Sequence, residues 1–88
     1  MKTTKLKDTV EMMVSEDYNE RFKAEYYQTK IRYEKLKAFN NRVEAAEISD
    51  IDMPVHDCPL ELLKKQQRAM GEYLHTLEVR SIIEEIVL

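Results

Sequence analysis

The sequence has one cysteine, one glycine, two prolines and no tryptophan in 88 residues. A single cysteine cannot form an internal disulfide, so a reducing compartment fits the chain best. With one glycine and two prolines, few positions force a helix to stop, and long helices are favoured. The chain also has no glycine-rich turn from which an oxyanion site could be built. An enzyme is therefore the least expected class of protein.

Long apolar runs and an excess of basic charge are also missing. No segment approaches the ~20 apolar residues of a membrane span, and the first ten residues, MKTTKLKDTV, lack the apolar core of a signal peptide. The net charge is −3, from 17 acidic and 14 basic residues that are mixed along the chain. General nucleic-acid binders show a basic excess on one face. We therefore expect a cytoplasmic protein that binds neither a membrane nor a DNA or RNA polymer.

The spacing of apolar residues predicts helices throughout the chain. Asp8 and Glu11 are spaced as a capping box, which predicts a short helix over about 8–14. Asp17 is a candidate N-cap, with Glu20 three residues on, for a long helix over about 18–46. The seam of that helix follows a three-four spacing through Phe22, Tyr26, Thr29, Tyr33, Leu36, Asn40 and Val43. A loop over 47–58 follows, and we expect its apolar residues to pack against the hairpin or a neighbouring subunit.

A second long helix is predicted over 59–86. Its inner seam is formed by Leu60, Leu63, Gln67, Met70, Leu74 and Leu77. The fold expected is therefore all-α: one domain over 1–88, with two long helices in an antiparallel hairpin after a short N-terminal helix. Further apolar residues lie outside both seams, and one hairpin partner cannot cover them. We expect the chain to assemble as a homo-oligomer.

The segment VHDCPLELL, residues 55–63, places His56, Asp57 and the cysteine Cys58 side by side. A catalytic or metal site would need further groups, and the only other histidine is distant in sequence. Proline is favoured at the first position of a helix, which makes Cys58 the N-cap and Glu61 the third helical residue. We interpret the segment as a helix start, with no catalytic residue and no metal ligand.

Gly71 lies inside a predicted helix, where glycine costs about 1 kcal/mol relative to alanine. Close approach of another helix is the favoured explanation, and a ligand lying against the backbone is the alternative. The five tyrosines raise the same question, because several have lysine or arginine nearby in the sequence. A tyrosine beside a cation can stack a base and hold its phosphate, although such residues more often form the rim of a core.

Two stretches, YNERFKAEYYQTKIRYEKLKAF and CPLELLKKQQRAMGEYLHTLEVRSIIEEI, carry a family resemblance. They resemble a family of small proteins from phages and integrated mobile elements that is named after a crAss-like phage protein. The second stretch fits the pattern LL..Q..AM..YL..LE.R, which includes Met70, Tyr73, Leu74, Leu77 and Arg80. The resemblance covers nearly everything from Tyr18 to the C-terminus.

That family is similar to the anti-CBASS sponges, phage proteins that sequester the cyclic oligonucleotide signals of bacterial immunity. Those sponges are short helical hairpins that assemble into oligomers and bind ligand between protomers. The resemblance implies a counter-defence protein of the host cytoplasm that binds a cyclic di- or trinucleotide without catalysis or cofactor. The sponges use an N-terminal tyrosine and a lysine in the following helix. The resemblance therefore implies ligand binding at Tyr18 and Lys30, with Arg21 as a further candidate.

Two other classes of function remain open from the sequence. The first is a protein-binding inhibitor or adaptor, anti-CRISPR-like or a host-takeover factor, that presents a helix face to a host protein. The second is a structural assembly module without a ligand.

Overall fold

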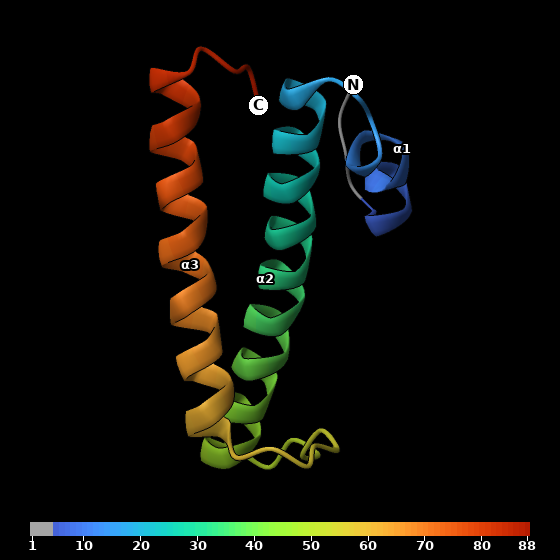
Figure 1. The fold of residues 1–88 in the computed structure, drawn as a ribbon. Coiled ribbons are helices and arrows are strands. Elements are labelled where there is room, and N and C mark those ends of the chain that lie inside the picture. Colours follow the sequence, from blue (N-terminus) through green and yellow to red (C-terminus); the bar gives the residue numbers. More distant parts are fainter. Residues whose placement is uncertain (1–4) are drawn as a thin grey trace.

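Two long helices lie side by side and antiparallel in the computed structural model, which describes residues 5–88. The elements are the 3₁₀ helix η1 (Leu6–Thr9), α1 (Val10–Met13), α2 (Tyr18–Ile48) and α3 (Leu60–Ile83). No strand occurs among these residues. Figure 1 shows α1 on the side of α2 that faces away from α3. The all-helical hairpin expected from the sequence is confirmed, and it forms an elongated body of 49 × 25 × 20 Å.

The start of α2 follows the predicted capping chemistry. Asp17 has an extended backbone and its side chain accepts a hydrogen bond from the Asn19 backbone N–H at 2.9 Å. This bond satisfies one of the four N–H groups that a helix leaves free at its first turn. The helix ends at Ile48, two residues beyond the expected end, where Ser49 becomes extended with φ −149°.

The start of α3 differs from the prediction by one residue. Pro59, with ψ 143°, lies outside the helix as its N-cap, and its carbonyl accepts from Leu62 N at 3.1 Å and Leu63 N at 3.2 Å. Cys58 is an exposed free thiol and makes no capping bond, so its assignment as the N-cap is wrong. The reason is that proline adopts an extended ψ here, whereas the first helical position requires a helical one.

The connection between α2 and α3 is anchored by His56. Its Nδ1 lies 2.7 Å from the Pro54 carbonyl, and its ring meets that of Phe39 edge-to-face, with centroids 6.0 Å apart. The apolar residues on either side stay exposed; Val55 has 95% of its surface accessible, and Ile51 61%. The hairpin therefore leaves these two side chains uncovered, and packing against a neighbouring subunit remains a prediction.

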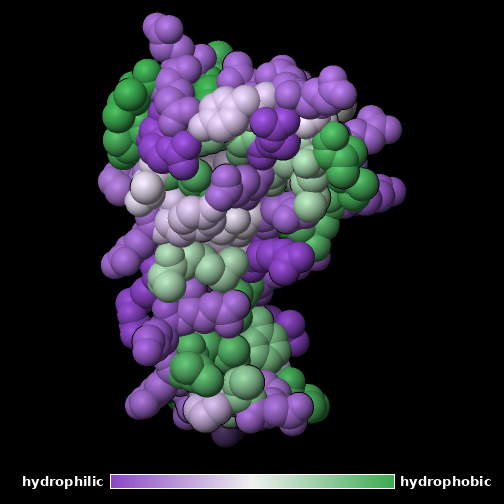
Figure 2. Space-filling view, in the orientation of Figure 1, coloured by the Kyte–Doolittle hydropathy of each residue, from purple (hydrophilic) through white to green (hydrophobic). Residues whose placement is uncertain are grey.

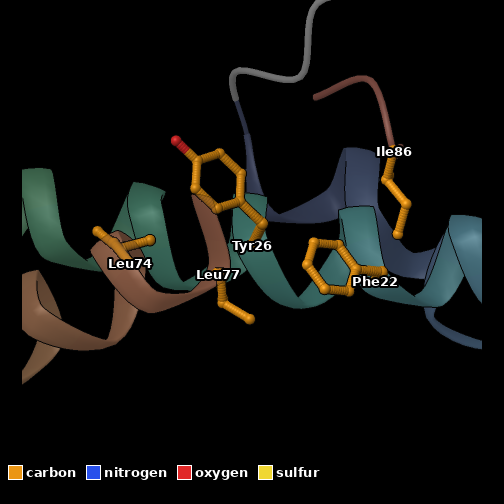
Figure 3. Packing of buried hydrophobic residues seen from close by; sticks show 5 residues of the cluster. All are labelled: Phe22, Tyr26, Leu74, Leu77 and Ile86. Carbon is orange, nitrogen blue, oxygen red and sulfur yellow. The ribbon is translucent and has the colours of Figure 1, made fainter. Parts of the chain in front are cut away.

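The end of α3 is a Schellman motif. Ile86 N donates to Ser81 O at 2.8 Å and Glu85 N donates to Ile82 O at 3.4 Å, while Glu85 has a left-handed φ of 55°. The helix ends at Ile83, three residues before the expected end. The turn brings the C-terminal tail back toward the start of α2, so that Ile86 points at Phe22 (Figures 1 and 3).

The core lies in the half of the hairpin that contains the start of α2 and the end of α3. Its buried members are Phe22, Tyr26, Leu74, Leu77 and Ile86, shown in Figure 3. Leu77 is fully buried, and so is Val43 in the other half of the hairpin. Five of these six residues, and Asn40, were predicted on the α2 and α3 seams, whereas Ile86 reaches the core only through the turn at Glu85.

A polar pair interrupts this apolar contact between the helices. Asn40, 1% exposed, donates from Nδ2 to Gln67 Oε1 at 2.9 Å. Asn40 Oδ1 is buried and accepts no hydrogen bond from residues 5–88. Buried amide pairs of this kind fix the register of two helices at a cost in stability.

Replacing both amides should therefore be tolerated better than replacing one. Gln67→Leu leaves the buried Asn40 amide without its acceptor and should lower the free energy of unfolding by about 1–3 kcal/mol. Asn40→Leu with Gln67→Leu removes both polar groups and should restore most of that loss. Urea unfolding of the four proteins in a double-mutant cycle measures the difference. A Gln67→Leu protein as stable as the original chain would contradict this account.

The left-handed residue at the end of α3 gives a second prediction. Glu85→Gly should raise the free energy of unfolding by about 0.5–1 kcal/mol, because glycine adopts positive φ without the steric cost of a Cβ. Glu85→Ala is the matched control: it removes the same carboxylate but keeps the Cβ, and it should not be stabilised. Thermal melts followed by circular dichroism make the comparison. Equal melting temperatures for the two variants would show that the backbone conformation is not strained.

Candidate functional site

Tyr18 lies in a three-residue polar cluster that joins the start of α2 to the end of α3. Its hydroxyl donates to Glu84 Oε1 at 2.6 Å and accepts from Arg80 Nη2 at 2.9 Å. Arg80 Nε also donates to Glu84 Oε2 at 3.0 Å, and the guanidinium lies over the Phe22 ring, 5.1 Å from its centroid. We call Tyr18, Arg80 and Glu84 the clasp. Because its members already bind one another, the Tyr18 hydroxyl is engaged inside the chain.

The clasp shifts the acid–base behaviour of all three members. The hydrogen bond from Tyr18, followed by Arg80, lowers the pKa of the Glu84 carboxyl below its ordinary value. The hydrogen bond to Glu84 raises the pKa of the Tyr18 phenol and that of the Arg80 guanidinium. The Tyr18 ring remains 47% exposed. The clasp is therefore a surface interaction that is intact only while Glu84 is ionised and Tyr18 is protonated.

Arg21 supports the turn that precedes α2. Its Nη1 donates to the Ser15 carbonyl at 2.7 Å, so the guanidinium ties the connection between α1 and α2 to the first turn of α2. Asp17 N donates to Ser15 Oγ at 3.1 Å in the same connection. This contact gives Arg21 a structural role, and its remaining N–H groups lie on an exposed residue.

Lys30 lies on another part of α2, beside Tyr26. Its Nζ is 5.8 Å from the centroid of the Tyr26 ring. The Tyr26 hydroxyl donates to Glu78 Oε2 of α3 at 2.6 Å. Burial, and then the hydrogen bond to Glu78, raise the pKa of the Tyr26 phenol far above its ordinary value. Tyr26 is therefore a neutral hydrogen-bond donor at any physiological pH.

The structure does not bring Tyr18, Arg21 and Lys30 together in one chain. Tyr18 and Lys30 are twelve residues apart in one helix, which separates their Cα atoms by about 18 Å along the axis and about 120° around it. The contacts on α3 agree, because Tyr18 binds Arg80 whereas Tyr26, next to Lys30, binds Glu78. Glu78 and Arg80 are two positions apart in α3, so they point about 160° away from each other around its axis. The clasp and Lys30 therefore lie on opposite flanks of the hairpin.

The flank that holds Lys30 is hollowed by an open groove. Two adjoining hollows, of about 580 and 190 Å³, share Tyr33, Gly71 and His75 in their lining. Lys30 lines the smaller hollow and Arg68 the larger. We call the two hollows together the Gly71 groove. The larger one is within the size range of small-molecule sites, although it is shallow and open to solvent.

Gly71 leaves room for the Tyr33 side chain of α2 at the floor of this groove. A Cβ built on Gly71 would lie 3.3 Å from Tyr33 Cε1 and 3.6 Å from its hydroxyl oxygen. The Tyr33 side chain therefore packs closely against this glycine, and a Cβ here would make a tight contact with its ring. The same contact sets the position of the Tyr33 ring in the groove wall.

The Gly71 groove combines an aromatic ring, cations and carboxylates. Lys30 and Arg68 supply positive charge, and the carboxylates lining the groove are Glu34, Glu72 and Glu78. Glu78 already accepts the Tyr26 hydroxyl. A ring, two cations and hydrogen-bond acceptors can together stack a base, hold a phosphate and accept from an amino group. None of the groups is arranged as a nucleophile with a base.

A separate hollow, outside the Gly71 groove, lies between α1, the start of α2 and the C-terminal tail. Its lining includes Asp8, Glu11 and Glu20, with Lys23 as its one cation among the described residues. This hollow has three carboxylates against one cation, whereas the Gly71 groove has three carboxylates against two cations. An anionic ligand therefore meets less charge repulsion in the Gly71 groove.

Residues 5–88 offer no group of three or more His, Cys, Asp or Glu side chains that could hold a metal ion. The helices of that same range include none whose length and apolar character would suit a membrane span.

Sequence reasoning placed Lys30 in a ligand site but missed the other groove residues. Arg68, His75 and Glu78 belong to an α3 flank next to the seam, and their 3–4 spacing could have grouped them. Arg80 and Glu84 have the i,i+4 spacing of an ion pair, a signal that was available. That Arg80 and Glu84 bind Tyr18, and that Glu78 binds Tyr26, depends on how the two helices align, which their sequences do not determine.

A family model described as Sequestin matches residues 16–82, which are 67 of the 88 residues. The match spans α2, the connection and nearly all of α3. It therefore includes the whole Gly71 groove, and it includes the clasp apart from Glu84. The description is that single word and states no ligand and no source. No curated protein and no solved structure matches the chain.

The clasp predicts a specific pH dependence of stability. Since the pKa of Glu84 is lowered from 4.5 in the folded state, its contribution is present above that value and is lost as the pH falls through the folded pKa. Glu84→Gln should therefore melt below the original chain at pH 7, and the gap should narrow as the pH falls below 4.5 and close once it is below the folded pKa of Glu84. Melting temperatures of both proteins between pH 3 and 8 test this.

The neighbouring carboxylate provides the control for that measurement. Glu85→Gln changes the same charge one residue away from the clasp, and its difference from the original chain should not show this pH dependence. A Glu84→Gln protein whose melting temperature equals that of the original chain at pH 7 would mean that the clasp does not stabilise the fold.

Proposed function

The chain belongs to the Sequestin family, and we propose from this premise that it binds and sequesters a small-molecule ligand without catalysis. The family name refers to sequestration and leaves the ligand open. We propose a cyclic di- or trinucleotide of the kind used as an immune signal, and a counter-defence role of phage type in the cytoplasm of a host cell. Family membership over most of the chain is the observation that carries the proposal.

The chemistry of the Gly71 groove supports a nucleotide ligand. A cyclic dinucleotide presents two bases and two phosphates, so it requires stacking surfaces and a few cations. The groove offers the Tyr33 ring with Lys30 at one end and Arg68 at the other. It does so without a broad positive surface, which fits a small ligand better than a nucleic-acid polymer.

Apolar side chains that the hairpin leaves exposed support assembly into a homo-oligomer. Ile82, Ile83 and Val87, near the end of α3, are 78%, 74% and 83% exposed. Figure 2 shows separate apolar patches over the upper end of α3, over α1 and at the lower end of the hairpin. Covering such surface by a second copy is a common source of stability for a small domain.

Assembly would also give Tyr18 and Arg21 a route to the ligand. In one chain they are separated from Lys30 both along the axis of α2 and around it. In an oligomer the Tyr18 end of one copy can lie against the groove of another, so that a ligand between them contacts all three residues. We propose Tyr18, Arg21 and Lys30 as ligand-binding residues in this sense.

The connection between the helices favours one alternative function. Ile48, Ile51 and Val55 are exposed there, between the acidic residues Asp50, Asp52 and Asp57. An inhibitor or adaptor could present such a segment to a host protein that has an apolar groove with a basic rim. Pull-down from a host lysate separates the two functions, because a sponge should carry small molecules and no stoichiometric protein.

Titration of the purified protein tests the proposal. Cyclic di- and trinucleotides, with cyclic signals derived from nicotinamide nucleotides in the panel, should include a ligand that releases or absorbs heat on binding in a calorimeter. Lys30→Ala should weaken that binding by about 10-fold or more, since it removes a charge-assisted contact to a phosphate. Tyr18→Ala and Arg21→Ala should also weaken it, measured below their own melting temperatures.

The matched control is Lys37→Ala, an exposed lysine seven residues further along α2 that lines neither hollow of the Gly71 groove. It should bind as the original chain does. No heat and no thermal shift with any compound of the panel would rule out a nucleotide sponge. Light scattering of the same samples gives the particle mass, and a monomer at micromolar concentration would contradict the shared site.

A further inference from the structure

We infer that the Gly71 groove is the subsite for one base of the ligand, an adenine or guanine that stacks on Tyr33, with the phosphates on its two sides held by Lys30 and Arg68. The inference rests on the proposed function, because it names where in one chain a sequestered nucleotide binds. Arg68, Tyr33, Gly71 and His75 are the residues that it adds to Lys30.

Tyr33 is the stacking surface because of where its ring is held. The ring is half-buried, and its edge lies 3.3 Å from the position that a Gly71 Cβ would take, so α3 limits how far the ring can move. A ring fixed in this way loses little conformational freedom when a base stacks on it. Tyr26 differs, because it is buried and its hydroxyl is bound to Glu78.

Lys30 and Arg68 come from different helices and line different hollows of the groove. Lys30 makes no ion pair with another residue among 5–88, and the same is true of Arg68. Both cations are therefore available to a phosphate. By contrast, Arg80 is paired with Glu84, and Lys64 is paired with Glu44.

The carboxylates of the groove indicate which base edge fits. Glu34 and Glu72 line the two hollows, and an ionised carboxylate only accepts hydrogen bonds. A base that binds beside them must donate, as the amino groups of adenine and guanine do. Uracil presents two carbonyl acceptors around a single N–H, so it meets these carboxylates less favourably. A purine also offers Tyr33 the larger stacking surface.

Gly71 has a role in this subsite beyond packing. Alanine at this position would require the Tyr33 ring to move by a few tenths of an ångström, since its Cβ would lie 3.3 Å from Cε1. In mid-helix, alanine is otherwise preferred to glycine. Gly71→Ala should therefore leave the melting temperature unchanged or higher while it weakens ligand binding, a combination that a purely structural glycine would not give.

The experiment compares cyclic diadenylate with cyclic diuridylate in the calorimeter, using the full chain and matched variants. Cyclic diadenylate should bind more tightly. Tyr33→Leu should lose about 5- to 150-fold in affinity, the range found for the loss of one stacked base, whereas Tyr33→Phe should bind nearly as the original chain. Arg68→Gln should weaken binding about tenfold and reduce its salt dependence, and Lys65→Gln, which lines neither hollow, should not.

If these two compounds give no heat, the member of the wider panel that binds the original chain is used with the same variants. Binding that survives unchanged in both Tyr33→Leu and Arg68→Gln would overturn the subsite while the sequestration proposal stands. A preference for cyclic diuridylate would overturn the assignment of a purine. If the original chain binds nothing in the panel, sequestration of a nucleotide fails, and the subsite fails with it.

Discussion

The burial of one row of side chains from α2 against one row from α3 is the constraint on which the rest of the structure depends. Leu77 and Phe22 lie in this contact, and burying a side chain of that size stabilises a fold by about 1.5–3 kcal/mol. The contact has few such residues, so the chain adds to it at both ends of the seam. Ile86 reaches it through a left-handed turn at Glu85, and Asn40 and Gln67 continue it as a hydrogen-bonded pair.

The same contact divides the remaining surface into two flanks. On one flank, Tyr18 is bound by Arg80 and Glu84; on the other, Tyr26 is bound by Glu78 beside the Gly71 groove. Two tyrosines eight residues apart in one helix thus have different partners, because the residues that they meet on α3 point in nearly opposite directions. The flank with the clasp is closed by one ion pair and the hydrogen bonds of Tyr18, whereas the groove keeps Lys30 and Arg68 available. This difference makes the groove the better place for an anionic ligand.

Exposed apolar residues connect the fold to the proposed function. The hairpin is too narrow, at 25 × 20 Å across, to cover residues that lie outside its single seam. Ile82 and Val87 are left exposed at one end, and Val55 is left exposed at the other. A sponge that binds its ligand between copies uses such surfaces to assemble, so that the surplus of apolar residues and the sequestering role have one physical explanation. The exposed connection also suits an adaptor, which is why particle mass and ligand titration are both informative.

Three features could be predicted from the sequence: the helical character of the chain, the residue at which α2 begins, and the side chains that form the two seams. Each of these follows from local chemistry: the scarcity of glycine and proline, the side chain of Asp17 at the first turn, and the three-four spacing that puts Phe22 and Leu77 on inner faces. Only the tertiary structure decided which residues meet across the hairpin, because pairing depends on the relative rotation and axial shift of two helices. For that reason Lys30 was found in the groove wall and Tyr18 in the clasp, and the spacing of Arg68 and His75 could group them on one flank of α3 but could not show that they face Tyr33.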